Sequence, residues 1–257
     1  MLSAIAIVPS APVMVPELAA GAAPELADLR EAAFAAASAL PGWWVVIGVG
    51  PEDAAVGPRR AGTFAGYGVD VRIALSSDPD AEPGRLPLCA LIAGWLRGQV
   101  KPDASAEVRV YARDHDVDAA IAVGRQLRAE IDGDADPIGV LVVVDGLHTL
   151  TERAPGGYDP ESIPVQAALD DALAHGDAAA LTGLPDTVVG RVGFQVLAGL
   201  TGPGPCSAKE LYRGAPYGVG YFVGVWLPAG RSDGGTPHAS GGPTHPKGRG
   251  TTGESIG

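Results

Sequence analysis

A run of five apolar residues, Val140-Leu141-Val142-Val143-Val144, is the feature that most constrains the fold of this chain. Neither face of a strand built from this run would carry a polar side chain. We therefore predict a strand over residues 138–144 that is buried on both faces at the centre of a sheet. Residues 107–111 instead alternate polar and apolar side chains, which predicts a half-exposed strand. A sheet with a doubly buried strand needs helices on both faces.

The rest of the chain alternates β-branched runs with Ala- and Leu-rich amphipathic segments. Further strands are predicted over residues 2–8, 43–49, 69–75 and 217–226. Helices are predicted over residues 24–39, 86–97, 118–131, 164–175 and 187–200. This order predicts an α/β fold with a mixed, mostly parallel central sheet flanked by helices, in a single domain.

The composition changes sharply near the C-terminal end of the 257-residue sequence. From Ala229 onward Gly, Ser, Thr and Pro dominate, and no apolar face can be drawn through the segment. We therefore predict one α/β domain over residues 1–228 and a disordered tail over residues 229–257. His238 and His245 lie in this tail, so we do not expect them to form a metal site.

The formal net charge of −12 narrows the set of partners. An acidic surface repels both a nucleic-acid backbone and an anionic membrane, so neither is expected. The first 15 residues contain prolines and no basic residue, which fits neither a signal peptide nor a membrane span. Cys89 and Cys206 are too few for a disulfide framework, and we expect a reducing cytoplasm. The sequence leaves the oligomeric state open, including a homo-oligomer.

Candidate functional residues lie in the turns that follow predicted strands, because ligands of open α/β sheets bind outside the carboxyl ends of the strands. Each predicted turn of this kind carries polar side chains, and we expect these to line one cleft. They are Ser10 and Glu17 after residues 2–8, Glu52 and Asp53 after residues 43–49, and Asp145 and His148 after residues 138–144.

His148 is the candidate with the clearest chemistry, since a histidine there can act as a general acid or base near neutral pH. The alternative is a loop histidine that caps a turn or bonds to Asp145. His115 and His175 are interpreted as surface residues. Five acidic residues are candidates for an oxygen-rich site. The alternative is that they are separate, solvated charges. They are Glu17, Glu52, Asp53, Asp145 and Glu210.

Gly48 and Gly50 follow or end a predicted strand, and such a pair is found in dinucleotide-binding loops. Here the third glycine of that motif is missing, and Pro51, Glu52 and Asp53 come next. Proline has no amide hydrogen to offer a phosphate, and the two acids would repel it. A tight turn at the end of the strand is therefore the preferred interpretation.

Four segments of the sequence carry a resemblance to a known family. They are Pro9-Ser10-Ala11-Pro12-Val13-Met14-Val15-Pro16-Glu17-Leu18, Gly62-Thr63-Phe64-Ala65-Gly66-Tyr67-Gly68-Val69-Asp70-Val71, Val144-Asp145-Gly146 with Ala154-Pro155-Gly156, and Ala215-Pro216-Tyr217-Gly218-Val219-Gly220-Tyr221-Phe222. In their order and spacing they resemble the bacterial class III extradiol ring-cleavage dioxygenase-like proteins. The resemblance extends over residues 1–227 and includes the wider superfamily shared with Memo-like proteins.

The resemblance implies an α/β fold and an extradiol ring-cleavage dioxygenase, an oxidoreductase that acts on a catecholic substrate with O2. It also implies non-haem Fe(II) held by two histidines and a third ligand, with open positions for the small aromatic ligand and dioxygen. His148 falls where the acid/base histidine of the superfamily follows its strand. The resemblance thus gives His148 a catalytic role, with Ser10 and Asp53 lining the same site.

This sequence departs from the family pattern at both ligand histidines. Their positions hold Ser10 and, in the best alignment, Glu52 or Asp53. Carboxylates in place of imidazoles favour a harder ion such as Mg²⁺ or Ca²⁺, or no metal. Two alternatives to a dioxygenase therefore stay open: a non-catalytic binding or scaffold protein with the same fold, and a metal-dependent hydrolase that uses Glu52 and Asp53.

Overall fold

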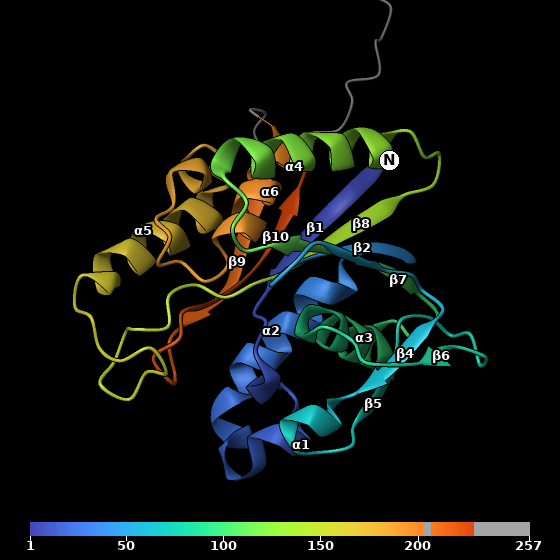
Figure 1. The fold of residues 1–257 in the computed structure, drawn as a ribbon, viewed down its shortest axis with the longest axis horizontal. Helices are drawn as coiled ribbons and strands as arrows, with labels where there is room; N and C mark the ends of the chain where they lie inside the picture. Colours follow the sequence, from blue (N-terminus) through green and yellow to red (C-terminus); the bar gives the residue numbers. More distant parts are fainter. Residues whose placement is uncertain (203–206, 229–257) are drawn as a thin grey trace, which may run out of the picture.

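The computed structural model describes residues 1–202 and 207–228 of the protein. The main sheet contains seven strands, and the chain alternates between these strands and covering helices (Figure 1). The strands are β1 (Leu2–Val8), β2 (Trp43–Gly50), β3 (Ala54–Val56), β7 (Ser105–Ala112), β8 (Ile138–Val143), β9 (Ser207–Gly214) and β10 (Tyr221–Leu227). The predicted tail, Cys206, His238 and His245 lie outside the described residues.

The strand order is β3-β7-β2-β8-β1-β10-β9. Strands β7, β2, β8 and β1 are mutually parallel, whereas β3, β10 and β9 each pair antiparallel with a neighbour. In register, Val143 of β8 pairs with both Val8 of β1 and Gly48 of β2, so these three strands end at the same edge of the sheet. The predicted mixed sheet is confirmed, with its four parallel strands adjacent to one another.

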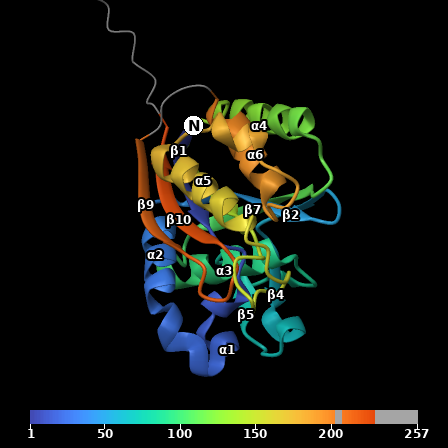
Figure 2. The ribbon, with the colours of Figure 1, turned by 90° about the vertical axis from the view of Figure 1, so that its left-hand side faces the viewer.

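Five helices cover the two faces of the sheet (Figures 1 and 2). They are α2 (Ala27–Ser38) and α3 (Leu88–Val100) on one face, and α4 (Val117–Asp132), α5 (Ser162–His175) and α6 (Arg191–Thr201) on the other. Short elements complete the connections: α1 (Pro16–Ala19), η1 (Pro12–Met14), η2 (Ala20–Leu26), η3 (Phe64–Tyr67) and η4 (Ala180–Gly183). No helix in residues 1–202 and 207–228 combines the length and apolar character required to cross a membrane.

The packing of β8 confirms the prediction made from its sequence. All six of its residues are buried, and its side chains alternate between two hydrophobic clusters, one under α2 and α3 and one under α4, α5 and α6. In β7 only alternate residues, Ala106, Val108 and Val110, are buried, as the polar/apolar alternation predicted. The doubly buried strand therefore separates two cores and anchors the three-layer arrangement.

The strand predicted over residues 69–75 is correct only for β5 (Arg72–Ala74), which belongs to a second sheet of order β5-β4-β6. Its partners are β4 (Arg60–Thr63) and β6 (Glu82–Pro83). The residues before β5 form a turn, in which the Thr63 hydroxyl donates to the Asp70 carboxylate and the Phe64 amide donates to the Val71 carbonyl. These local bonds replace the ladder that a longer strand would need.

Three predicted helices begin later than expected. Helix α2 starts at Ala27 because residues 20–26 form the 3-10 helix η2, which contains Pro24. Helix α3 starts at Leu88, after Pro87 in extended conformation, and α6 starts at Arg191 after a turn closed by the Val188 amide on the Pro185 carbonyl. Proline limits the backbone just before the starts of α2 and α3, and a turn delays the start of α6.

Helices α4 and α6 pack closely through glycine. A Cβ added at Gly124 would lie 2.1 Å from the Val196 carbonyl oxygen, and one at Gly199 would lie 2.2 Å from the Ile121 carbonyl oxygen. In both cases the obstacle is backbone, which cannot rotate away as a side chain can. The two glycines therefore set the separation between the helices on this face of the sheet.

We expect Gly124→Ala to lower the free energy of unfolding by about 2–3 kcal/mol, because relieving the clash separates α4 from α6. Urea denaturation would measure this effect. Gly98→Ala in α3 is the matched control, since a Cβ there meets nothing within 4 Å. Helix propensity alone predicts that the free energy of unfolding of this control rises by up to about 1 kcal/mol. Equal gains for both variants would contradict close glycine packing.

Candidate functional site

The topology of the sheet predicts where a ligand should bind. From β2 the chain continues through α3 to β7, whereas from the adjacent strand β8 it continues through α5 and α6, on the opposite face, to the other end of the sheet. The connections that leave β2 and β8 therefore diverge. In open α/β sheets such a topological switch point leaves a crevice outside the carboxyl ends of the strands.

A cavity of about 220 Å³ lies at this point. Its walls come from the ends of the four neighbouring parallel strands, from α3 and from the segment before α6. The lining residues are Ser10, Val49, Leu88, Arg113, Val143, Val144, Asp145, Val189 and Gly190. We call this the Asp145 cavity. Ser10 and Asp145, predicted to line a cleft because each follows the carboxyl end of a strand, are both in this lining.

Asp145 is held by its neighbours at the end of β8. The Ser10 amide donates to Asp145 Oδ1 at 2.9 Å, and the Gly190 amide donates to the Asp145 carbonyl at 2.9 Å. Burial raises the pKa of Asp145 to about 7, and the hydrogen bond from Ser10 opposes this rise without cancelling it. At neutral pH this carboxyl is therefore divided between its protonated and ionised forms.

Arg113 brings a positive charge to the same cavity. Its backbone is fixed on two sides: its amide donates to the Gly50 carbonyl at 3.0 Å, and its carbonyl accepts from Arg191 at 3.4 Å. Arg191 also donates to the His115 carbonyl at 3.0 Å and pairs with Asp186. The β7–α4 connection is thereby tied to α6 while the Arg113 side chain stays exposed.

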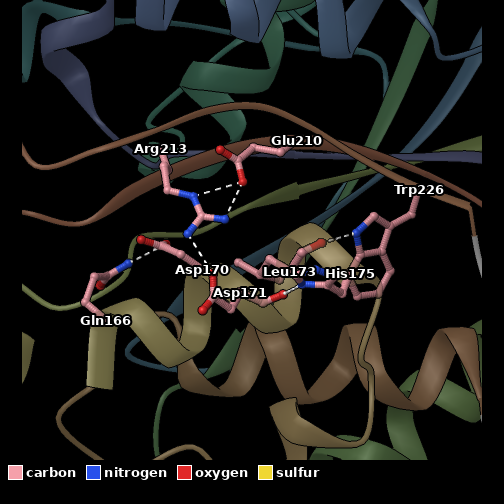
Figure 3. Close-up of polar contacts among 8 residues, drawn as sticks. All are labelled: Gln166, Asp170, Asp171, Leu173, His175, Glu210, Arg213 and Trp226. Atoms are coloured by element: carbon pink, nitrogen blue, oxygen red, sulfur yellow. Dashed lines mark hydrogen bonds and ion pairs between the residues drawn. The ribbon is translucent and has the colours of Figure 1, made fainter. Parts of the chain in front are cut away.

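The loop that carries Asp145 is anchored by Gln166 of α5, a buried residue that the sequence analysis did not single out. The Leu147 amide donates to Gln166 Oε1 at 2.8 Å. Gln166 Nε2 in turn donates to Asp170 Oδ1 at 2.8 Å (Figure 3). A Cβ at Gly146 or Gly220 would lie 2.2 or 2.1 Å from Gln166 Oε1. Only glycine at these two positions leaves room for the amide.

The network continues from Gln166 toward β9. Burial raises the pKa of Asp170 to about 6, while the bond from Gln166 and the nearby Arg213 act in the opposite direction. Arg213 donates to Asp171 at 2.8 Å and to Glu210 (Figure 3). The backbone of the Asp145 loop is thus connected through α5 to an ion-pair cluster on the edge strand.

His148 lies outside the lining of the Asp145 cavity. Its ring packs against Gly156, where an added Cβ would be 2.6 Å from His148 Nε2. Its Nδ1 is buried and has no hydrogen-bond partner in the described part of the chain, so the bond to Asp145 given above as an alternative is not formed through this atom. The acid/base role given to His148 stays a prediction, and the titrating group that the cavity does contain is Asp145.

The other predicted acids do not gather at Asp145. Glu17 is exposed on α1, and Glu52 is exposed in the turn after β2. Asp53 accepts the Ala112 amide at 2.7 Å and His115 Nε2 at 2.8 Å, and these two bonds, the first being stronger, lower its pKa. Glu210 pairs with Arg213 on β9. These acids form separate surface contacts instead of one oxygen-rich site.

Gly48 and Gly50 are explained by packing. Both lie within β2, where a Cβ at Gly48 would be 2.3 Å from Cys89 Sγ and one at Gly50 would be 2.6 Å from Val110 Cγ1. Cys89 itself is buried in α3, and burial raises the pKa of its thiol to about 11. The glycine pair therefore admits α3 and β7 side chains and does not form a phosphate-binding turn.

The donor set does not fit the iron centre implied by the family resemblance. The resemblance places Ser10 and either Glu52 or Asp53 at the positions of the ligand histidines, and the Asp53 carboxylate is already bonded to Ala112 and His115. Across residues 1–202 and 207–228, no group of three His, Cys, Asp or Glu side chains is arranged to hold a metal ion. No step of chemistry at the cavity is therefore assigned to iron.

Comparisons with known proteins inform the fold and not the activity. No protein-family model and no curated protein matches the sequence. Among solved structures, the fold is similar to the crystal structure of the uncharacterized protein JW3007 from Escherichia coli K12, with a TM-score of 0.51 and 10% sequence identity. The similarity covers 88% of this chain and 99% of that one. At this identity, a likeness of fold is what the comparison establishes.

The raised pKa of Asp145 predicts a dependence of stability on pH. Its carboxyl favours the folded state below the ordinary carboxyl pKa, and this contribution is lost as the pH rises toward and through about 7. We expect Asp145→Asn, whose amide oxygen still accepts from Ser10, to become more stable relative to wild type between about pH 4 and pH 8. The change should be on the order of 2 kcal/mol.

Urea denaturation across this pH range would measure the effect. Asp114→Asn makes the same change of charge at an exposed position and serves as the control. If the free energies of unfolding of wild type and Asp145→Asn changed with pH in the same way, the raised pKa of Asp145 would be contradicted.

The anchoring role of Gln166 gives a separate prediction. Gln166→Ala leaves the Leu147 amide and the Asp170 carboxyl without their shared partner, so we expect a loss of about 2–4 kcal/mol in the free energy of unfolding. Gln126→Ala is the matched control, because Gln126 is exposed and bonds to Glu130 within α4. The control should change stability by less than about 0.5 kcal/mol. A similar small loss at Gln166 would show that the loop does not depend on it.

Proposed function

We propose that this chain is a divergent member of the class III extradiol ring-cleavage dioxygenase-like family whose cavity binds a small hydroxylated aromatic acid without iron. The observation that carries the proposal is that Asp145, a carboxyl with a pKa of about 7, and Arg113 line the same cavity at the switch point of the sheet. Such a site combines a neutral hydrogen-bond donor with a cation.

The size and walls of the cavity support a small, flat ligand. Its volume of about 220 Å³ is below the range of about 300–1,000 Å³ typical of drug-sized ligands. Val49, Leu88, Val143 and Val189 supply apolar contact surface. Val189 is 46% exposed, so a ring placed against it would remove apolar surface from water.

The polar groups support a ligand with hydroxyls at one end and a carboxylate at the other. Oδ1 of Asp145 is occupied by the Ser10 amide, and Oδ2 has no hydrogen bond to any described residue. A protonated Oδ2 can donate a hydrogen bond to a ligand hydroxyl. Ser10 lines the same cavity and is a second polar residue there. Arg113 can pair with the carboxylate. A catecholic ring is also what the family resemblance implies for this cleft.

The same geometry argues against the two catalytic alternatives. A ring-cleaving dioxygenase needs ligands for Fe(II), and a hydrolase built on Glu52 and Asp53 needs free carboxylates that converge. Asp53 is bonded to Ala112 and His115, and Glu52 meets no second ligand among the described residues. Binding without metal therefore has the better support.

The net charge of −12 and the cysteine content support a cytoplasmic protein that does not bind nucleic acid. Among the described residues, Arg113 is the one basic residue in the lining of the cavity, which suits a small anionic ligand better than a polymer.

The proposal is tested by calorimetric binding of catechol and dihydroxybenzoate in the presence of a chelator. We expect dihydroxybenzoate to bind about tenfold more tightly than catechol, because only the acid pairs with Arg113. Arg113→Gln should abolish this difference and leave catechol binding unchanged. Binding of both should weaken as the pH rises through about 7, and Asp145→Asn should remove this dependence.

An oxygen electrode supplies the opposing measurement. If the protein consumed oxygen with catechol or dihydroxybenzoate after addition of Fe(II), the proposal that the cavity binds its ligand without iron would be overturned. Absence of saturable binding by both compounds would overturn the choice of ligand class.

A further inference from the structure

A second cavity shares one lining residue, Leu88, with the Asp145 cavity. It has a volume of about 670 Å³ and lies between η3 and the segment that leads into α3. Leu88, the first residue of α3, lines both cavities. The Leu88 side chain, which is partly exposed, therefore forms part of the wall of both spaces. We call this second space the Arg85 cavity.

The walls of the Arg85 cavity are held in place by packing. Phe64 of η3 is fully buried beneath it and contacts the Tyr67 ring edge-on, with the ring centroids 6.1 Å apart. On the facing side Leu86 and Leu91 are buried, and a Cβ at Gly62 would lie 2.8 Å from Leu86. The cavity is therefore part of the folded structure and not a gap left by an exposed loop.

Its charge distribution indicates what it would bind. The other arginines of the neighbouring small sheet are paired: Arg59 with Asp78, Arg60 with Glu82 and Arg72 with Asp70. Arg85 lines the cavity, is exposed, and makes no ion pair with any carboxylate of the described residues. Tyr67, beside it, is 47% exposed. A cation and an aromatic surface in a chain of net charge −12 favour an anionic, partly apolar group.

We propose that the Arg85 cavity is a second subsite, and that the natural ligand is an aromatic acid carrying a flexible substituent that ends in an anionic group. The substituent passes Leu88, lies along Tyr67 and pairs with Arg85. This inference rests on the proposed function, because it extends the ligand of the Asp145 cavity. The ligand inferred here has the ring and carboxylate proposed for the Asp145 cavity, and in addition a flexible substituent with a second negative charge.

The test compares dihydroxybenzoate with the same ring bearing an added alkyl chain that ends in a carboxylate. We expect the chain to increase affinity about tenfold in wild type. Arg85→Gln should remove this gain and leave the binding of the short probe unchanged. Arg59→Gln is the matched control, since it removes the same charge from an exposed arginine that lines neither cavity.

A second measurement separates failure of the subsite from failure of the proposed function. Phenylglyoxal modifies exposed arginines, and peptide mass spectrometry reports Arg85 and Arg59 independently. The chain-bearing probe, or an alkyl dicarboxylate with no ring, should protect Arg85 and not Arg59. Protection of Arg85 without binding of the short ring probe would overturn the proposed function and retain the subsite. Ring binding without a chain effect and without protection would overturn the subsite alone.

Discussion

Strand β8 is buried on both faces, and its insertion between β2 and β1 determines the arrangement of the rest of the chain. An apolar strand in this position needs parallel neighbours and helices on both sides. The chain meets this requirement by crossing one face with α2 and α3 and the other with α4, α5 and α6. The connections from β2 and β8 then leave in opposite directions, and the Asp145 cavity lies between them. The site is thus a consequence of how the core is covered.

A strand as apolar as β8 must end in groups that satisfy its last backbone atoms, and the polar network around Asp145 performs this task. The Gly190 amide bonds to the Asp145 carbonyl, the Gly146 amide bonds to the Gly220 carbonyl, and the Leu147 amide bonds to Gln166. Close approach of these segments buries the Asp145 carboxyl and raises its pKa. The bonds that stabilise the end of the central strand also create the group suited to bind a ligand.

Much of the fold follows from patterns in the sequence, and the limits of prediction have physical causes. Apolar runs identified β1 and β8 almost residue for residue, and the rule for strand ends brought Ser10 and Asp145 together. The role of Gln166 could not be predicted because a glutamine in an amphipathic helix is usually solvated. The residues next to it in the sequence do not indicate that Gly146 and Gly220 make room for its side chain. Edge strand β9 was missed because its sequence is largely polar. Side-chain pairing, such as that of Asp53 with His115, depends on loop geometry that residue order does not reveal.

The loops that line the Asp145 cavity are held in place by contacts between residues of the chain itself. Its loops are held by backbone amides and by Gln166, none of which is a metal ligand. In the proposed family, the side chains at the positions of Ser10 and of Glu52 or Asp53 can therefore differ without removing the walls of the cleft. Under the proposed function, recognition depends on two groups of the lining, the Asp145 carboxyl, whose pKa is raised to about 7, and the cation of Arg113. In that proposal the selectivity for a hydroxylated anion comes in part from Asp145, the same residue whose contacts hold the end of β8.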